Sequence, residues 1–333
     1  MVFSNRTKLF LTLLAFSLGL CVTISLSVGY AKASIWDFVD LLTGNSSKGM
    51  TFIIRNIRLP RVLVCLLGGG SLALSGLLLQ NLTKNPLADS GILGINAGAG
   101  LVLTLFIGYA QTSDAQLIAL RPILAVIGGT MTTMLVYWIS RKKNHGINPT
   151  RLIITGIGLS SLLSGLMITI VSQIDAFKVP FIVSWLNGSI AGGTWTNVLW
   201  FSPLISLLWL ITYAQGQSLN ILNLNEQTAL ALGLNLQKQR LVVLILSIAL
   251  AALSVILIGN ITFIGLIAGH ISRRLLGVDH RLTIPSSLMI GMILLLLADT
   301  LGRVLLVGTG IPTGIIVTMI GAPYFLYLMM KVR

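Results

Sequence analysis

The chain has 333 residues, of which 55% are hydrophobic and 9% are charged, and its mean hydropathy is +0.95. Such values exclude an ordinary soluble domain and predict a polytopic membrane protein. The net charge of +14 does not indicate a nucleic-acid binder, because the basic residues punctuate apolar runs instead of gathering on one water-facing surface.

Apolar runs, divided by charged residues, prolines and glycines, predict about ten membrane spans. The first run, residues 9–30, is longer than the roughly 7 to 15 apolar residues of a signal peptide, so we expect it to remain as a span. The others cover residues 62–82, 91–109, 120–140, 152–172, 197–214, 241–258, 261–272, 284–302 and 313–330. The run at 261–272 is too short to cross alone and requires surrounding protein at membrane depth.

The basic residues also predict an orientation. A cytoplasmic N-terminus divides the 22 lysines and arginines 14 to 8 in favour of the inside, in agreement with the positive-inside rule. An even number of spans then returns the C-terminus to the cytoplasm. Three of the outer cations, Arg55, Arg58 and Arg61, stand within seven residues, which suggests that something outside requires them.

The second span is crowded with small residues: Gly68, Gly69, Gly70, Ala73, Ser75 and Gly76. Small side chains allow neighbouring helices to approach closely. The run GGGSLA also resembles a dinucleotide-binding fingerprint, but no strand precedes it, so we interpret it as helix packing. Lys84, Asn85 and Pro86 follow, and the proline ends the helix.

The sequence contains no recognisable catalytic or metal-binding set. No G-x-x-x-x-G-K-[ST] phosphate loop occurs in the 333 residues, so the chain cannot hydrolyse ATP by that route. The histidines at 145, 270 and 280 lack metal-ligand spacing, and no Ser-His-acid set is evident. Cys21 and Cys65 lie inside apolar runs, which predicts buried thiols instead of a disulfide framework. We therefore expect no catalytic residue, cofactor or metal site.

Several short motifs follow one another along the chain. They are RLPRVLVCLLGGG and its continuation over residues 58–100, WLNGS at 185–189, ALALG at 229–233, FIGLI at 263–267, DHR at 279–281, AD at 298–299 and IGAP at 320–323. In this order they resemble the FecCD-type permease subunits of bacterial ABC importers for iron-siderophores, haem and cobalamin. The resemblance covers almost the whole chain. It implies an all-α polytopic membrane protein of type II ABC importer permease architecture, with one transmembrane domain over residues 1–333.

The resemblance also implies the partners and the cargo. Such a permease works as a homodimer or as half of a heterodimer in the bacterial cell membrane, with two ABC ATPase subunits inside and an extracytoplasmic substrate-binding protein outside. A ferric siderophore is the favoured cargo, with haem and cobalamin as alternatives. Gly269 and Gly310 replace a proline and an acidic residue expected by the family pattern, which weakens any assignment to a substrate subgroup. An ion-coupled secondary transporter is a further alternative, although such proteins usually carry charged or unwound sites at the membrane midplane.

The longest inner loop, residues 219–240, carries a short helical pattern. Glu226 suits the first turn of a helix, Ala229 and Ala231 favour helix, and Gly233 can end it. The resemblance implies that this is the coupling helix that docks into a cleft of the ATPase subunit. The alternative is a surface helix that merely connects two spans.

The predicted topology brings Arg58, Arg61 and Arg303 to the outer face. The resemblance implies that they receive acidic side chains of the binding protein, where rim charges steer encounter and fix orientation. The alternative is that they extend to lipid headgroups. Asp299 lies within the ninth span four residues before Arg303, so an i,i+4 ion pair is a simpler interpretation than a proton relay.

The second span is also the predicted wall of the translocation pathway, facing its equivalent in the partner chain. We expect Gly68, Leu77, Leu78 and Gln80 to be among its lining residues. A pathway for chemically diverse chelates should be smooth and weakly binding, because passage requires easy exit.

Overall fold

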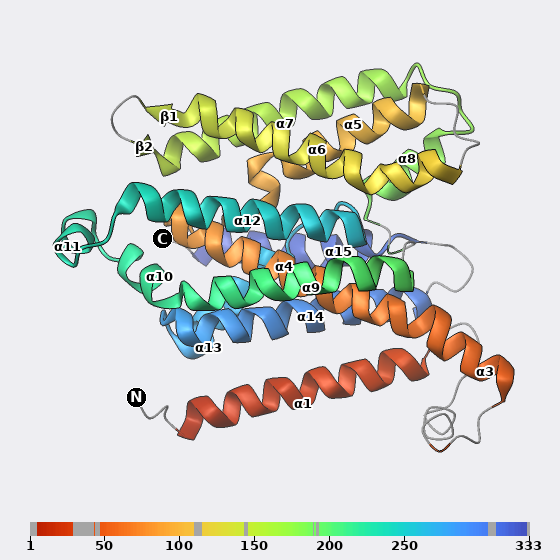
Figure 1. Cartoon of the computed structure of the whole chain (residues 1–333), viewed down its shortest axis with the longest axis horizontal. Helices are drawn as coiled ribbons and strands as arrows, with labels where there is room; N and C mark the ends of the chain where they lie inside the picture. The colour runs from red at the N-terminus through yellow and green to blue at the C-terminus, as the bar shows by residue number, and fades with distance from the viewer. Residues whose placement is uncertain are drawn as a thin grey trace.

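The computed structural model of the chain is built almost entirely of helices that lie alongside one another (Figure 1). It describes residues 5–28, 43, 47–109, 115–142, 146–188, 190, 193–305 and 311–331. The longer helices are α1 (Asn5–Ser27), α4 (Leu59–Thr83), α5 (Ile95–Tyr109), α6 (Ala115–Ser140), α7 (Pro149–Val171), α9 (Trp195–Ala214), α12 (Leu236–Ile258), α13 (Ile264–Leu276), α14 (His280–Leu305) and α15 (Thr313–Lys331). The shorter ones are α3 (Lys48–Phe52), the π-helix η1 (Ile53–Arg58), the 3-10 helix η2 (Ser90–Leu93), α8 (Val179–Leu186), α10 (Gly216–Leu222) and α11 (Glu226–Ala231). Two residues each in β1 (Arg141–Lys142) and β2 (Gly146–Ile147) pair antiparallel between α6 and α7.

The helices confirm the predicted fold class. Among the described residues, 8 helices are long and apolar enough to cross a membrane. The two remaining predicted spans correspond to α5 and α13, of 15 and 13 residues, which at 1.5 Å per residue reach only about 20 Å of the roughly 30 Å apolar core. The second span is longer than predicted, because α3 and η1 extend α4 into one helix of 36 residues, Lys48–Thr83.

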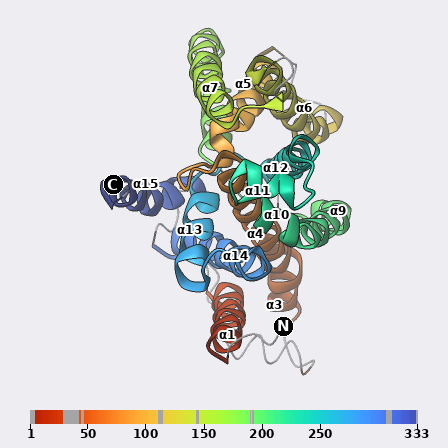
Figure 2. The ribbon, with the colours of Figure 1, turned by 90° about the vertical axis from the view of Figure 1, so that its left-hand side faces the viewer.

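Helix α4 occupies the centre of the bundle, surrounded by α9, α12, α13 and α14 (Figure 2). Its small residues explain this position. A Cβ atom added to Gly69 would lie 2.5 Å from the carbonyl oxygen of Gly291 in α14, and one added to Gly76 would lie 2.4 Å from Cα of Gly265 in α13. Backbones therefore touch directly at both crossings, which confirms the interpretation of the glycine run as helix packing.

The short helix α13 begins inside the bundle, where its entry is held by side chains. Phe263, just before α13, has a left-handed backbone with φ of 69°, and its N–H donates to Asp89 Oδ2 at 3.1 Å. Gln80 Nε2 donates to the carbonyl oxygens of Ala88 at 3.1 Å and Gly265 at 3.3 Å. These bonds satisfy backbone groups that a broken helix leaves open, and they confirm that the 261–272 run is packed in protein.

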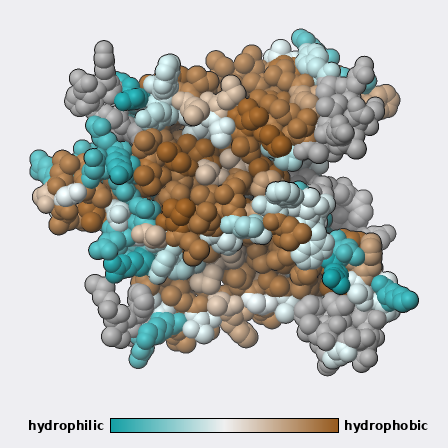
Figure 3. Space-filling view, viewed as in Figure 1, coloured by the Kyte–Doolittle hydropathy of each residue, from teal (hydrophilic) through white to brown (hydrophobic). Residues whose placement is uncertain are grey.

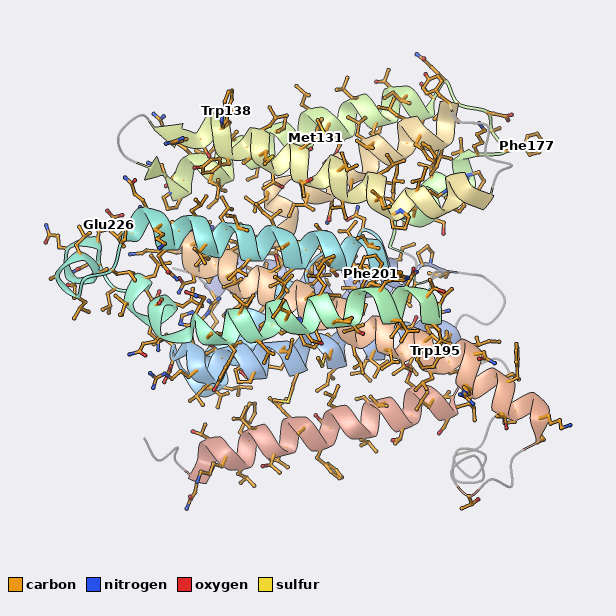
Figure 4. The ribbon with its side chains drawn as sticks, viewed as in Figure 1. Met131, Trp138, Phe177, Trp195, Phe201 and Glu226 are labelled. Carbon is orange, nitrogen blue, oxygen red and sulfur yellow. The ribbon has the colours of Figure 1, made fainter. Side chains whose placement is uncertain are left out.

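The outer surface has the pattern of a membrane protein. An apolar band crosses the middle of the molecule, and hydrophilic side chains gather toward its two ends (Figure 3). Trp138 and Met131 on α6, which Figure 4 labels, are 79% and 59% exposed. Large apolar side chains exposed around the middle of a bundle require hydrocarbon instead of water around them.

Candidate functional site

One end of the bundle carries the predicted coupling helix. Helix α11 projects there beside α10 (Figures 1 and 4). Asn225 caps α11, because its Oδ1 accepts from the N–H of Thr228 at 2.8 Å. Gly233 follows the helix with a left-handed φ of +81°, which favours glycine. The predicted helix and its end at Gly233 are therefore confirmed, whereas docking to an ATPase stays a prediction.

The exposed and buried sides of α11 differ sharply. Ala229 is fully buried, whereas Leu230 and Leu232 are each 58% exposed. Ala231 is also exposed. Exposed leucines at the tip of a projecting element are typical of a contact surface for another protein.

Glu226 ties α11 to the start of the next long helix. Its Oε1 lies 2.5 Å from Nη2 of Arg240 in α12. The hydrogen bond and the positive charge of Arg240 hold the pKa of Glu226 below its ordinary value. The ion pair braces α11 against α12, a contact that local helix signals did not reveal.

The opposite end of the bundle holds the predicted docking arginines, and two of them cap α1. Arg58 is 4% exposed and donates through Nη1 to the carbonyl oxygens of Leu26 at 2.6 Å and Ser27 at 3.0 Å. Arg303 donates through Nη2 to Ser25 Oγ at 2.7 Å. Helix α1 has no basic residue in its own last turn, so these arginines supply the positive charge that its C-terminus favours.

The buried carboxylate of Asp299 organises the same end. Arg303 Nε lies 3.0 Å from Asp299 Oδ2, which confirms the predicted i,i+4 pair. Arg61 Nη2 lies 2.8 Å from Oδ1, a partner that sequence spacing could not reveal. Thr313 Oγ1 donates to the same carboxylate at 3.2 Å. With Asp299 only 1% exposed, the network joins α4, α14 and α15, and binding-protein docking by its arginines stays a prediction.

Other cations at this end are more exposed than the predicted three. Lys48 and Arg55 are exposed and line an open cavity of about 660 Å³ together with Thr51, Phe52, Asn56, Leu59 and Trp195. Trp195, labelled in Figure 4, donates through Nε1 to the carbonyl oxygen of Arg55 at 2.9 Å. The indole thereby joins α9 to η1 beside this basic cavity.

The prediction that Gly68, Leu77, Leu78 and Gln80 line a pathway between two subunits is wrong. Leu77 and Leu78 are fully buried, and Gln80 is 2% exposed. A Cβ atom on Gly68 would meet Cγ2 of Ile258 at 2.7 Å. A wall between subunits must be exposed on each subunit, whereas these residues are enclosed by their own chain. The small residues of α4 serve packing inside the protomer, as expected of a helix that is apolar on all sides.

Helix α7, unlike α4, has small residues that are exposed on the surface of the single chain. Gly158, Ser161, Gly165 and Thr169 are all exposed, and their spacing of three, four and four residues places them on one helical face. A Cβ atom on Gly158 or Gly165 would meet nothing within 4 Å. This face, called here the α7 small face, is uncovered in the single chain, and the exposed Ile154 and Leu162 flank it.

One of the two departures from the family pattern, Gly269, lies within the described residues. Gly269 lies against Gln80, whose Oε1 would be 2.6 Å from an added Cβ atom. Its neighbour His270 makes an edge contact with the ring of Tyr324, with centroids 6.0 Å apart. Gly310, and Ser189 of the WLNGS motif, lie outside the described residues.

Comparisons with known proteins agree with this architecture. The chain is 36% identical over 313 residues to the iron(3+)-hydroxamate import system permease protein FhuG of Bacillus subtilis (strain 168), covering 92% of each chain. It is 35% identical over 323 residues to the hemin transport system permease protein HmuU of Yersinia pestis, covering 96% of each. A solved inward-facing structure of a metal-chelate type ABC transporter superposes with a TM-score of 0.83 at 32% identity, covering 98% of this chain and 100% of the other.

The family assignment rests on nearly the full length of the chain. The sequence model of the FecCD transport family matches residues 17–331, a range that begins in the middle of α1 and includes every later helix that the structure describes. The projecting α11 and the ordered motifs all fall within it. The chain therefore belongs to the FecCD transport family and is a multi-pass permease subunit of an ABC importer.

Proposed function

We propose that this permease carries ferric siderophores in an ATP-driven importer. The observation that carries the proposal is the family match over residues 17–331, together with a relative named for ferric hydroxamate import at 36% identity. Haemin is the second candidate, because a relative named for hemin transport is nearly as similar at 35% identity. Cobalamin is a further alternative.

The cargo is tested in a strain lacking the chain. Uptake of radiolabelled ferric hydroxamate, haemin and cobalamin is measured before and after complementation. Restored uptake of the ferric hydroxamate alone supports the siderophore proposal, and restored haemin uptake alone replaces it. Purified chain alone in liposomes should accumulate no cargo against a gradient; accumulation there would favour an ion-coupled secondary transporter.

ATP hydrolysis belongs, in this proposal, to two separate subunits that dock on α11. The exposed Leu230 and Leu232 supply an apolar contact, and Glu226, Ala229, Ala231 and Gly233 shape the helix that presents it. Leu230→Asp should abolish co-purification of the ATPase while membrane insertion persists. Leu275→Asp is the matched control, since Leu275 is 55% exposed on α13 but lies outside α11. Normal co-purification by Leu230→Asp, or by the harsher Gly233→Arg and Ala229→Asp, would remove the coupling assignment.

A substrate-binding protein docks, in this proposal, on the end that carries the arginines. Lys48 and Arg55 offer the accessible charge, and Arg61 with a 31% exposed side chain adds to it, while Arg58 and Arg303 hold α1 in place. Rim charges of this kind steer encounter and are screened by salt. Charge reversal of Lys48 and Arg55 together should weaken association most at low ionic strength. Lys238→Glu, at the opposite end on α12, is the control, and equal association by both variants would refute this docking site.

A second permease subunit completes the pathway, and we place the pathway on the α7 small face. Small residues without neighbours in the single chain are suited either to close helix contact or to a smooth conduit. Gly165→Trp should block uptake, because an indole would fill that face. Gly19→Trp is the matched control, since Gly19 on α1 also has nothing within 4 Å. Whether the second subunit is a copy of this chain or a sister chain is read from cross-linking of Gly158→Cys in membranes containing only this permease.

The orientation proposed places both termini in the cytoplasm. Helix α1 begins and helix α15 ends toward the end of the bundle that carries α11 (Figure 1), the end proposed to meet the ATPase. Reporter fusions at each terminus that are active only in the cytoplasm test the orientation. Activity of only one fusion would require an odd number of crossings.

A further inference from the structure

The coupling element, defined here as α10 and α11, is fastened to the rest of the bundle through hydrogen bonds made by side chains of α10, α4 and the start of α14. Helix α10 immediately precedes α11, and its Asn220 accepts through Oδ1 from both the backbone N–H and Nδ1 of His280, at 2.8 Å each. Asn220 Nδ2 donates to Asp279 Oδ1 at 2.7 Å. On its other side, His280 Nε2 lies 3.0 Å from Nδ2 of Asn81, near the end of α4. We call Asn81, Asn220, Asp279 and His280 the polar clasp.

The hydrogen bonds of the polar clasp each have a defined direction, whereas Asn81 Oδ1 is buried without a hydrogen-bond partner among the described residues. A backbone N–H can only donate, so the bond from the His280 N–H identifies the amide oxygen of Asn220. His280 Nδ1 faces the same oxygen and therefore carries a proton. In a neutral imidazole the other nitrogen then accepts, and Asn81 Nδ2 is its donor. The same amide also donates to the carbonyl oxygen of Leu219 in α10 at 3.3 Å.

The polar clasp joins α10 to two helices that are themselves locked together. Asn81 belongs to α4, and His280 begins α14 with Asp279 immediately before it. Further along, Gly69 and Gly291 bring the two backbones into direct contact. At the far end, Arg61 of α4 pairs with Asp299 of α14. The α4–α14 pair is therefore tied at its middle and its far end, and its near end is held by α10.

Two members of the polar clasp are buried, which makes their bonds costly to break, and Asn220 and Asp279 are half-buried. His280 and Asn81 are each 2% exposed, so a donor or acceptor that loses its partner there is not rehydrated. A displacement of α10 thus either breaks four hydrogen bonds at once, the buried bond from Asn81 to Leu219 and the three part-buried bonds of Asn220, or carries the ends of α4 and α14 with it. As long as these hydrogen bonds are intact, α4 and α14 are expected to move with α10.

We infer that the polar clasp is the joint through which movement of the coupling element reaches the α4–α14 pair, and through it the outer network around Asp299. Asn220 is the positioning residue of this joint. The inference rests on the proposed docking of an ATPase at α11. It adds a route to that proposal, namely which side chains make α4 and α14 follow α10 when α11 is pushed.

The test uses the complete complex of permease and ATPase subunits in nanodiscs, and its readout does not depend on the cargo. Cys21 and Cys65 are replaced by alanine, and Ile57, which is 53% exposed on η1 at the outer end, becomes the only cysteine. The ATP-dependent change in its maleimide labelling rate is measured and divided by the rate of ATP hydrolysis. In the chain with an intact polar clasp we expect ATP to change the labelling rate.

A reciprocal exchange then isolates the polar clasp. Asn220→Asp places two carboxylates in contact at the 2.7 Å pair, and the ATP-dependent change per ATP hydrolysed should fall about tenfold, the effect of about 1.4 kcal/mol. Adding Asp279→Asn reverses the pair, because the amide introduced at position 279 can donate to the new carboxylate while that carboxylate still accepts from His280; the Arg281 N–H then loses the Asp279 Oδ1 acceptor that it has in the parent. The double variant should recover the change. Asp279→Asn alone is the control, since asparagine keeps both the acceptor and the helix cap.

Three results would overturn the inference. One is an Asn220→Asp variant that responds to ATP like the parent. Another is an Asn220→Asp variant in which assembly with the ATPase and the ATP-dependent change in labelling fall in equal proportion. The polar clasp would then stabilise the structure without transmitting movement. The third is failure of the double variant to recover. An ATPase that does not co-purify with the parent chain at all would instead refute the proposed docking at α11, so the two failures are distinguishable.

Discussion

The crossing of α4 and α13 at Gly76 gives the sharpest prediction about stability. A Cβ atom on Gly76 would lie 2.4 Å from Cα and 2.6 Å from the carbonyl carbon of Gly265. Ordinary carbon contacts are about 3.5 to 4.0 Å, so Gly76→Ala forces the two helices apart by about 1 Å. Both sides are backbone, and no side-chain rotation can relieve the overlap. Overpacking of this kind costs about 1 to 3 kcal/mol, and the better helix propensity of alanine returns about 1 kcal/mol.

The assay is thermal unfolding of the purified chain in detergent, followed by size exclusion. Gly76→Ala should lower the midpoint, and Gly76→Val should lower it further because it adds two methyl groups to the same crossing. Gly19→Ala and Gly19→Val are the matched controls, because an added Cβ atom at Gly19 on α1 meets nothing within 4 Å. Equal shifts at the two positions would refute the reasoning, since helix propensity alone would then explain both.

Three further outcomes follow from the charged side chains. Asp299→Ala leaves Arg61 and Arg303 without their carboxylate and should destabilise the chain by about 3 to 5 kcal/mol, measured by the same thermal assay. An unchanged midpoint would contradict a stabilising role of the network around Asp299. Arg58→Met removes one cap of α1 and should raise the labelling rate of a cysteine introduced at the partly buried Leu14 as the helix loosens; an unchanged rate would show that packing alone holds α1. The pKa of Glu226 is held below its ordinary 4.5 by Arg240, so the pair contributes stability above that pH and loses it as the pH falls through the lowered pKa. The midpoint difference between the parent and Glu226→Gln, at most about 1 kcal/mol because Glu226 is exposed, should therefore be constant from about pH 6 to about pH 8 and shrink below about pH 4.5.

Local signals in the sequence predicted several features that the structure confirms. The position of α11 followed from a favourable Glu226, two alanines and a terminal Gly233. The pair between Asp299 and Arg303 followed from a spacing of four residues on one helix. Such features depend on residues within one or two turns of each other, so the chain specifies them before any helix meets another.

Contacts between distant residues could not be predicted in the same way. Arg61 and Asp299 are 238 positions apart, and Asn220 and His280 are 60 apart. Nothing in either neighbourhood names the partner, because the contact exists only once α4, α10 and α14 are packed. The same holds for Arg58, whose sequence position predicts an outer cation but whose burial against α1 is a tertiary outcome.

The sequence by itself determined that this chain is a helical membrane protein, where its helices run and which short helix projects from the bundle. Only the tertiary structure decided which helices are central, and it reversed the prediction for α4 while revealing the α7 small face. The physical reason is that lipid and protein interior are both apolar. Hydrophobicity therefore marks a helix as membrane-embedded without saying whether its face meets lipid, another helix or a second subunit, and that choice is made by close packing.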